Sequence, residues 1–163
     1  MNEDKKLNTF NINTNNDIIT YNRKGIEKLS KEDTIILRVL DPFGQNVVLW
    51  ESTFIYHIVG EHNNDARHFL NTDKNFQRIE YTISNPTFIL EDKNNENRWE
   101  FISLVDIEHE GETRLKGLSV ITEESDSIIN SQEVVTIIPK SNISQNITNR
   151  RVVYNVNDNH KRT

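Results

Sequence analysis

Two short runs of β-branched and aliphatic residues open the patterned part of the chain. They cover residues 34–40 and 47–49, and the sequence Asp41-Pro-Phe-Gly-Gln45 separates them. Asp before Pro, with Gly two places further on, favours a tight turn. The pattern therefore predicts a β-hairpin.

The next segment, WESTFIYHIVGEH at residues 50–62, has a helical period. At about 100° per residue, its large apolar residues fall within one half of the helix circumference. These residues are Trp50, Phe54, Ile55, Ile58 and Val59. The pattern predicts an amphipathic helix packed on a sheet, with His57 and Glu61 at the margin of the apolar half and His62 inside it.

A second helix is predicted for residues 73–84. Phe76, Ile79 and Ile83 lie at helical spacing along this segment. Asn85-Pro86 should end the helix, because proline disfavours the helical conformation in the residue before it.

From residue 87 the period changes to that of strands. Four strands are predicted, at residues 87–91, 98–108, 113–122 and 133–138, with Pro139 ending the last. Their short polar connections favour hairpins and hence antiparallel pairing. Strict alternation places Thr136 on the same face of its strand as Val134 and Ile138.

Helices followed by strands are typical of the α+β class. We expect an N-terminal hairpin and helices packed on a four-stranded antiparallel sheet. Residues 1–17 are expected to form a polar flexible tail, residues 18–139 a single domain, and residues 140–163 a polar C-terminal tail with a short strand at 152–156. Residues 18–29 mix apolar and charged positions and are compatible with a strand or a short helix.

Composition narrows the class of protein. The 163 residues suit one domain, and the low hydrophobic fraction of 34% is explained by polar tails around an ordinary core. The absence of cysteine excludes disulfides, thiolate metal sites and a cysteine nucleophile. The sequence shows no signal peptide and no apolar run of membrane length, so we expect a cytoplasmic protein with no membrane partner. The net charge of −6 argues against broad binding to a phosphate backbone.

The order of these motifs resembles one branch of a nuclease superfamily. The motifs lie within residues 35–139 and comprise Asp41 and Gly44, Trp50, His57-Ile58, Glu61-His62, Asn85-Pro86, Arg98 and Val134-Val135-Thr136. Together they resemble the phage and mobile-element branch of the barnase/EndoU/colicin E5–D/RelE-like (BECR) superfamily.

The resemblance implies a toxin-like endoribonuclease that needs no metal and no cofactor. It would cleave RNA by attack of the 2′-hydroxyl, leaving a 2′,3′-cyclic phosphate. The implied partners are RNA, with tRNA as one candidate, and a cognate antitoxin or immunity protein. The implied site residues are His57, Glu61, His62, Arg98 and Thr136.

Each of these residues also has a purely structural interpretation. A histidine in the last helical turn can bind the free carbonyl groups of the helix end. Arg98 can be a solvated strand end paired with Glu91 or Glu100, and Thr136 can simply be a good strand former. In the catalytic interpretation, by contrast, His57 and Glu61 are four residues apart, so Glu61 can orient His57 or raise its pKa.

Two further expectations concern ligands. Aromatic side chains that could stack on RNA bases are Tyr56, Phe88 and Trp99. No metal is expected, because H-x-x-x-E-H lacks a third ligand at a recognised spacing.

The alternative to an enzyme is a catalytically inactive binding module. Such a protein would engage a host protein or act as an immunity protein, since an acidic surface can cover a nucleic-acid site. The choice depends on whether His57, His62, Arg98 and Thr136 gather on one concave surface.

Overall fold

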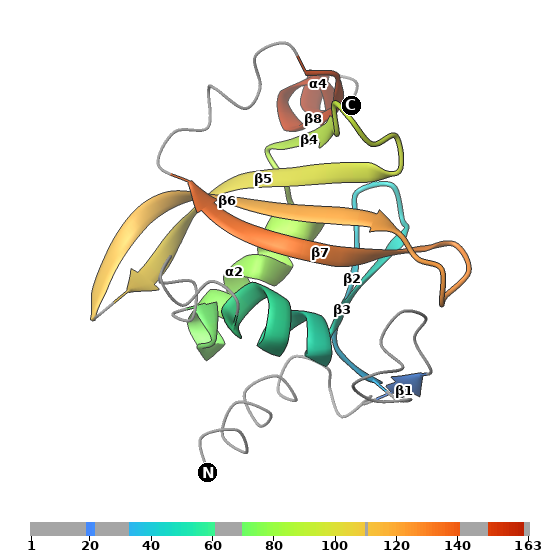
Figure 1. The fold of residues 1–163 in the computed structure, drawn as a ribbon. Helices are drawn as coiled ribbons and strands as arrows, with labels where there is room; N and C mark the ends of the chain where they lie inside the picture. The colour runs from blue at the N-terminus through green and yellow to red at the C-terminus, as the bar shows by residue number, and fades with distance from the viewer. Residues whose placement is uncertain (1–18, 22–32, 61–69, 110, 141–149, 162–163) are drawn as a thin grey trace.

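The structure, a computed structural model, describes residues 19–21, 33–60, 70–109, 111–140 and 150–161. The strands are β1 (Ile19–Tyr21), β2 (Asp33–Leu40), β3 (Asn46–Trp50), β4 (Phe88–Glu91), β5 (Arg98–His109), β6 (Glu112–Glu124), β7 (Ser131–Lys140) and β8 (Val152–Asn155) (Figure 1). The helices are the π-helix η1 (Thr53–Gly60) and the α-helices α2 (Asp73–Ser84) and α4 (Val156–Lys161).

The described strands form one eight-stranded sheet in the order β1-β2-β3-β7-β6-β5-β4-β8. β3 and β7 run parallel, whereas the other neighbouring pairs are antiparallel. The expected α+β fold, with a hairpin and helices packed on a four-stranded antiparallel sheet, is therefore wrong. The protein is mostly sheet, and the sheet is mixed, because the hairpin β2–β3 joins it through residues 46–48 of β3 and 131–133 of β7.

The local elements agree with the sequence pattern. The hairpin, helix α2 and the four successive antiparallel strands β4–β7 are confirmed. β7 continues through Pro139 to Lys140, two residues past its expected end at Ile138. The strand expected near residues 152–156 is β8, which pairs with β4 and brings part of the C-terminal segment into the sheet. Of the two alternatives for residues 18–29, the described part, β1, is a strand.

The β2–β3 turn shows how its sequence fixes the hairpin. The Asp41 carboxylate is buried and accepts hydrogen bonds from the backbone N–H of Phe43 at 2.9 Å and of Gln45 at 2.8 Å. Gly44 has a φ of +80°, a conformation that glycine adopts without a steric cost.

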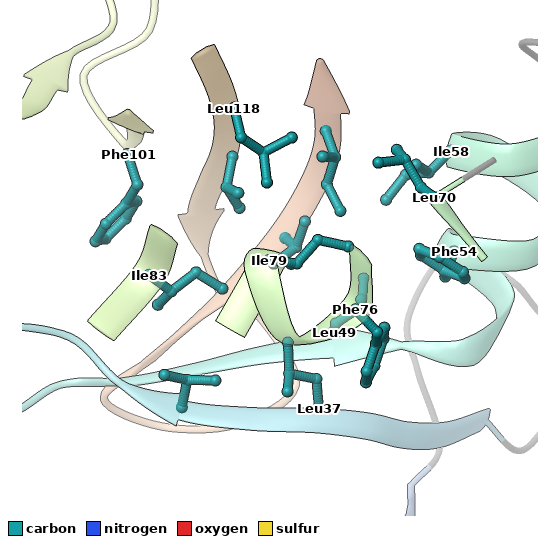
Figure 2. Packing of buried hydrophobic residues seen from close by; sticks show 14 of the residues in the cluster. Leu37, Leu49, Phe54, Ile58, Leu70, Phe76, Ile79, Ile83, Phe101 and Leu118 are labelled. Atoms are coloured by element: carbon teal, nitrogen blue, oxygen red, sulfur yellow. The ribbon is translucent and has the colours of Figure 1, made fainter. Parts of the chain in front are cut away.

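The sheet wraps around α2 (Figure 2). Leu37 and Leu49 of the hairpin lie on one side of this helix, and Phe101 and Leu118 of the central strands lie on the other. Thr72 begins α2 by accepting a hydrogen bond from the N–H of Asn75 at 3.2 Å. We call the side of the sheet that contacts α2 the inner face, and the opposite side the outer face.

The helix predicted over residues 50–62 needs two corrections. Trp50 is fully buried but belongs to β3, where its indole N–H donates to Glu133 at 2.9 Å. The helix that follows is a π-helix, whose hydrogen bonds join residues five apart, so an α-helical wheel does not describe its faces. Phe54, Ile58 and Val59 are nevertheless buried, as the pattern predicts.

Candidate functional site

η1 positions the first predicted site residue, His57. At the start of this helix the buried Asp33 carboxylate accepts hydrogen bonds from both the backbone N–H and the hydroxyl of Ser52. The helix then packs against β3 and β7 through its buried face. His57 is half-buried, and Tyr56 beside it is 62% exposed. Glu61 and His62 lie outside the described residues.

Arg98 opens β5, and its guanidinium forms an ion pair. Its Nε donates to the Glu123 carboxylate at 3.0 Å, and the two side chains are 37% and 38% exposed. Glu123 lies directly opposite Arg98 on β6. The partner is therefore neither Glu91 nor Glu100, and Arg98 could bind a phosphate only by sharing or giving up this exposed ion pair.

Thr136 lies on β7 opposite Ile121 of β6, but not where strict alternation puts it. A β-bulge shifts the register, so that Thr122 faces Val134 while Ile121 faces Thr136. Val134 and Ile137 point into the core and Thr136 lies on the outer face, which corrects the expected alignment of Thr136 with Val134. Its hydroxyl oxygen is buried and has no hydrogen-bond partner among the described residues.

The three aromatic residues predicted to stack on RNA lie on different elements. Tyr56 is on η1, Phe88 on β4 and Trp99 on β5. The Trp99 ring packs edge-on against Phe43 at 5.7 Å between centroids, and Phe43 packs in the same way against Tyr154 at 5.9 Å. Trp99 contacts the inner core. On β4, Glu91 lies opposite Trp99, and Phe88 is three positions away from Glu91, so the Phe88 side chain faces the other side of the sheet. They do not form one stacking platform.

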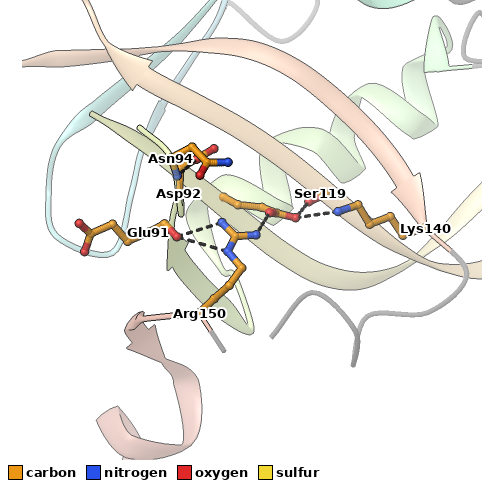
Figure 3. A network of polar contacts seen from close by, with 7 residues as sticks. Glu91, Asp92, Asn94, Ser119, Lys140 and Arg150 are labelled. Carbon is orange, nitrogen blue, oxygen red and sulfur yellow. Dashed lines mark hydrogen bonds and ion pairs between the residues drawn. The ribbon is translucent and has the colours of Figure 1, made fainter. Parts of the chain in front are cut away.

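A polar cluster on the outer face, which we call the Glu100 cluster, was not predicted from the sequence (Figure 3). Glu100 of β5 is 4% exposed and lies two strands from Thr136, with Ile121 between them. Its carboxylate accepts hydrogen bonds from the Ser119 hydroxyl, from Lys140 Nζ at 3.0 Å and from Arg150 Nη1 at 2.5 Å. The cluster thus joins three strands and the segment before β8.

Arg150 has a second role in this cluster. Its Nη2 and Nε donate to the Glu91 carbonyl oxygen at 3.0 and 3.3 Å, at the end of β4. All of its nitrogens therefore have partners. Lys140 donates one bond to Glu100, and its ammonium carries three donors, so it can also bind an anion on the outer face.

The Glu100 cluster fixes the charge of its carboxylate. Burial raises the pKa of Glu100, but hydrogen bonds from Ser119, Arg150 and Lys140 outweigh burial, so the pKa lies below its ordinary value. Glu100 is therefore ionised near neutral pH and acts as a hydrogen-bond acceptor rather than as an acid. Its two cations leave the cluster with a net positive charge.

We expect this ionisation to make stability depend on pH. The unfolded pKa of a glutamate is about 4.3. Because the folded pKa is lower, the stabilisation from Glu100 is complete above the unfolded pKa and is lost as the pH falls through the folded pKa. Asp41, Glu51 and Glu80 have pKa values raised chiefly by burial, so their contributions have the opposite sign in a similar range.

Comparison of the wild type with Glu100→Gln isolates the contribution of Glu100. Urea unfolding of both proteins from about pH 7 to about pH 3 should show that their difference in unfolding free energy shrinks in acid. The other carboxylates are common to both proteins and cancel. A difference that stays constant with pH would contradict the assigned ionisation of Glu100.

No relative of this chain was found in three comparisons with known proteins. They covered protein-family models, curated proteins and solved structures. None of them found a match. Among the described helices, none has the length and apolar character needed to cross a membrane. The resemblance to the BECR superfamily therefore stays a prediction that rests on the motifs.

Proposed function

We propose that this protein is a metal-independent endoribonuclease that cleaves RNA by attack of the 2′-hydroxyl on the adjacent phosphate. The observation that carries this proposal is the Thr136 hydroxyl, which is buried on the outer face of β7 without a hydrogen-bond partner among the described residues. The helix that carries His57 also contacts β7, but its buried residues belong to the inner core. Buried polar atoms without partners are rare in folded proteins and call for an explanation. A phosphate oxygen that accepts this hydrogen bond would supply one, provided that the side chains covering the hydroxyl move aside when RNA binds.

Each group then has a chemical role. His57 transfers a proton near neutral pH, where histidine changes charge, and Thr136 donates a hydrogen bond to the phosphate. Lys140, four positions along β7 from Thr136, adds positive charge to the same face of the sheet. Glu61 and His62 belong to the proposed site through the motif resemblance. A toxin role, a cognate antitoxin and a cytoplasmic location are parts of the same proposal.

Incubation of the purified protein with tRNA and with total RNA in EDTA tests this function. We expect cleavage products that end in 2′,3′-cyclic phosphates. His57→Ala should reduce the cleavage rate by at least about 100-fold, because general acid–base catalysis contributes about that much or more. His109→Ala, at the end of β5, is the matched control and should leave the rate unchanged. Absence of cleavage, or cleavage that does not depend on His57, would contradict the proposal.

Thr136→Val separates a functional hydroxyl from a structural one. The change keeps the shape of the side chain and removes a buried oxygen that has no partner among the described residues. We expect stability to stay the same or to rise, because no hydrogen bond within the described protein is lost. Cleavage should nevertheless fall. Unchanged cleavage would remove Thr136 from the site.

The second candidate function is a binding module without catalysis. It is favoured by Arg98, whose guanidinium is paired with Glu123. In the same assay, a folded protein that cleaves no RNA would favour this candidate.

A further inference from the structure

β5 is longer than β4, its neighbour on one side. β4 pairs only with residues 99–102 of β5, which continues to His109. Every second residue of β5 directs its backbone N–H and carbonyl toward the β4 side rather than toward β6. The Ile102 carbonyl accepts a hydrogen bond from the Thr87 N–H at 2.8 Å. The Glu108 N–H donates to Asn75 Oδ1 at 3.0 Å, and Asn75 Nδ2 donates to the Glu108 carbonyl at 2.8 Å. Leu104 follows the same alternation, so its N–H and carbonyl also face the uncovered side.

Helix α2 covers only part of this edge. Asn75 occupies both backbone groups of Glu108, and Arg78 Nε donates to the Asp106 carbonyl at 3.3 Å. Within the described part of the chain, the N–H and carbonyl of Leu104 and the N–H of Asp106 have no hydrogen-bond partner. We call residues 104–106 the open edge. Unpaired groups of this kind are a template for the addition of another strand.

An open groove of about 280 Å³ runs beside the open edge. It is lined by Arg78 and Tyr81 of α2, by Leu104, Val105 and Asp106 of β5, and by Leu115 of β6. Leu104 is 56% exposed, Leu115 is 65% exposed and Tyr81 is 49% exposed. Single exposed apolar residues are ordinary, but three that line one groove along an unpaired strand edge mark an interaction surface.

We propose that the open edge binds an extended peptide segment of a partner protein, which adds a strand to β5. Side chains of such a strand point alternately to the two faces of the sheet. Those that point toward α2 meet Arg78, which forms no ion pair among the described residues. Those that point the other way meet Leu104 and Leu115. The fitting segment alternates acidic and apolar side chains.

Hydrogen exchange in the free protein tests whether the edge is open. The amides of Leu104 and Asp106 should exchange quickly, whereas those of Ser103 and Val105, which point toward β6, should be protected. Protection of Leu104 and Asp106 in the free protein would overturn the proposal. A molecular mass that doubles with concentration together with such protection would assign the edge to a second copy of the chain instead.

Titration with a defined peptide tests the occupant. The probe is an acetylated peptide of about seven residues that alternates Leu and Glu, and the matched control peptide alternates Leu and Lys. In amide NMR spectra, the Leu/Glu peptide should shift and protect Leu104 and Asp106, and it should bind more tightly than the Leu/Lys peptide. Equal binding of both peptides, or no binding of either, would overturn the proposal.

Two variants locate the binding. Leu104→Pro removes the N–H that faces the groove but none that faces β6, and proline is tolerated at sheet edges. It should weaken binding about tenfold. Arg78→Glu should reverse the preference in favour of the Leu/Lys peptide, and it keeps the test available if Leu104→Pro does not fold.

The matched control for the charge reversal is Arg114→Glu. Arg114 lies on the β5–β6 hairpin that also lines the groove, but it pairs with Glu112 at 2.6 Å. This variant should keep the preference for the Leu/Glu peptide. If Arg78→Glu binds like the wild type, the groove is not the docking site. These measurements use no RNA, so they are independent of the ribonuclease proposal.

Discussion

Glu100→Gln should lower the free energy of unfolding by about 3 to 5 kcal/mol, because it removes one partner of a buried ion pair. Lys140 and Arg150 would keep their charges in a site where their side chains are only 23% and 17% exposed. The amide cannot neutralise two cations. Urea unfolding at neutral pH measures the loss.

Glu123→Gln is the matched control for this change. Glu123 pairs with Arg98 on the same pair of strands, but both side chains are more than one third exposed. Solvent screens such a pair, so we expect a loss of about 1 kcal/mol or less. Similar losses for the two variants would show that the Glu100 cluster is not a buried charge site.

Phe54→Ala should lower the free energy of unfolding by about 3 to 5 kcal/mol. Phe54 is fully buried and packs edge-on against Phe76 of α2, with 5.9 Å between ring centroids and 81° between ring planes. This contact attaches η1 to the core, as Figure 2 shows. Removal of the ring leaves a cavity between η1 and α2, and thermal or urea unfolding measures its cost.

Tyr56→Ala on the same helix is the control. Its ring is 62% exposed, so the change should alter the unfolding free energy by no more than about 0.5 kcal/mol. A comparable loss at Tyr56 would mean that η1 is held by its exposed side rather than by the core. Because η1 carries His57, the ribonuclease proposal also expects Phe54→Ala to reduce cleavage.

The elements that the sequence predicts are those whose determinants lie close together in the chain. Residues 73–84 form a helix with Thr72 at its start and Asn85-Pro86 at its end, all within one short segment. The hairpin turn has its determinants, among them Asp41 and Gly44, within residues 41–45. Period and turn chemistry are sufficient for these elements.

The extent of the sheet could not be predicted in this way. Alternation shows which face of a strand is buried, but it does not identify the strand beside it. The hydrophobic period also placed Trp50 in a helix, because a buried indole at the end of β3 fits either period. The bulge before Thr136 inserts one residue and reverses the face that alternation assigns.

The Glu100 cluster was hidden for the same reason. Its partners Lys140 and Arg150 lie 40 and 50 positions away from Glu100. In the sequence, Lys140 follows Pro139 and Arg150 lies in an Asn-rich segment, so neither residue suggests a buried partner. A glutamate between Trp99 and Phe101 was the one available signal.

The parallel contact between β3 and β7 has a consequence for how the chain folds. Gln45 and Gln132, which meet beside this contact at 2.7 Å, lie 87 positions apart in the sequence. The β2–β3 hairpin and the β4–β7 meander each form from neighbouring residues, whereas their junction must close a long loop first. We expect the hairpin and the meander to form early and the parallel pairing of β3 with β7 to form last. Formation of this pairing is then the step that commits the chain to its native topology.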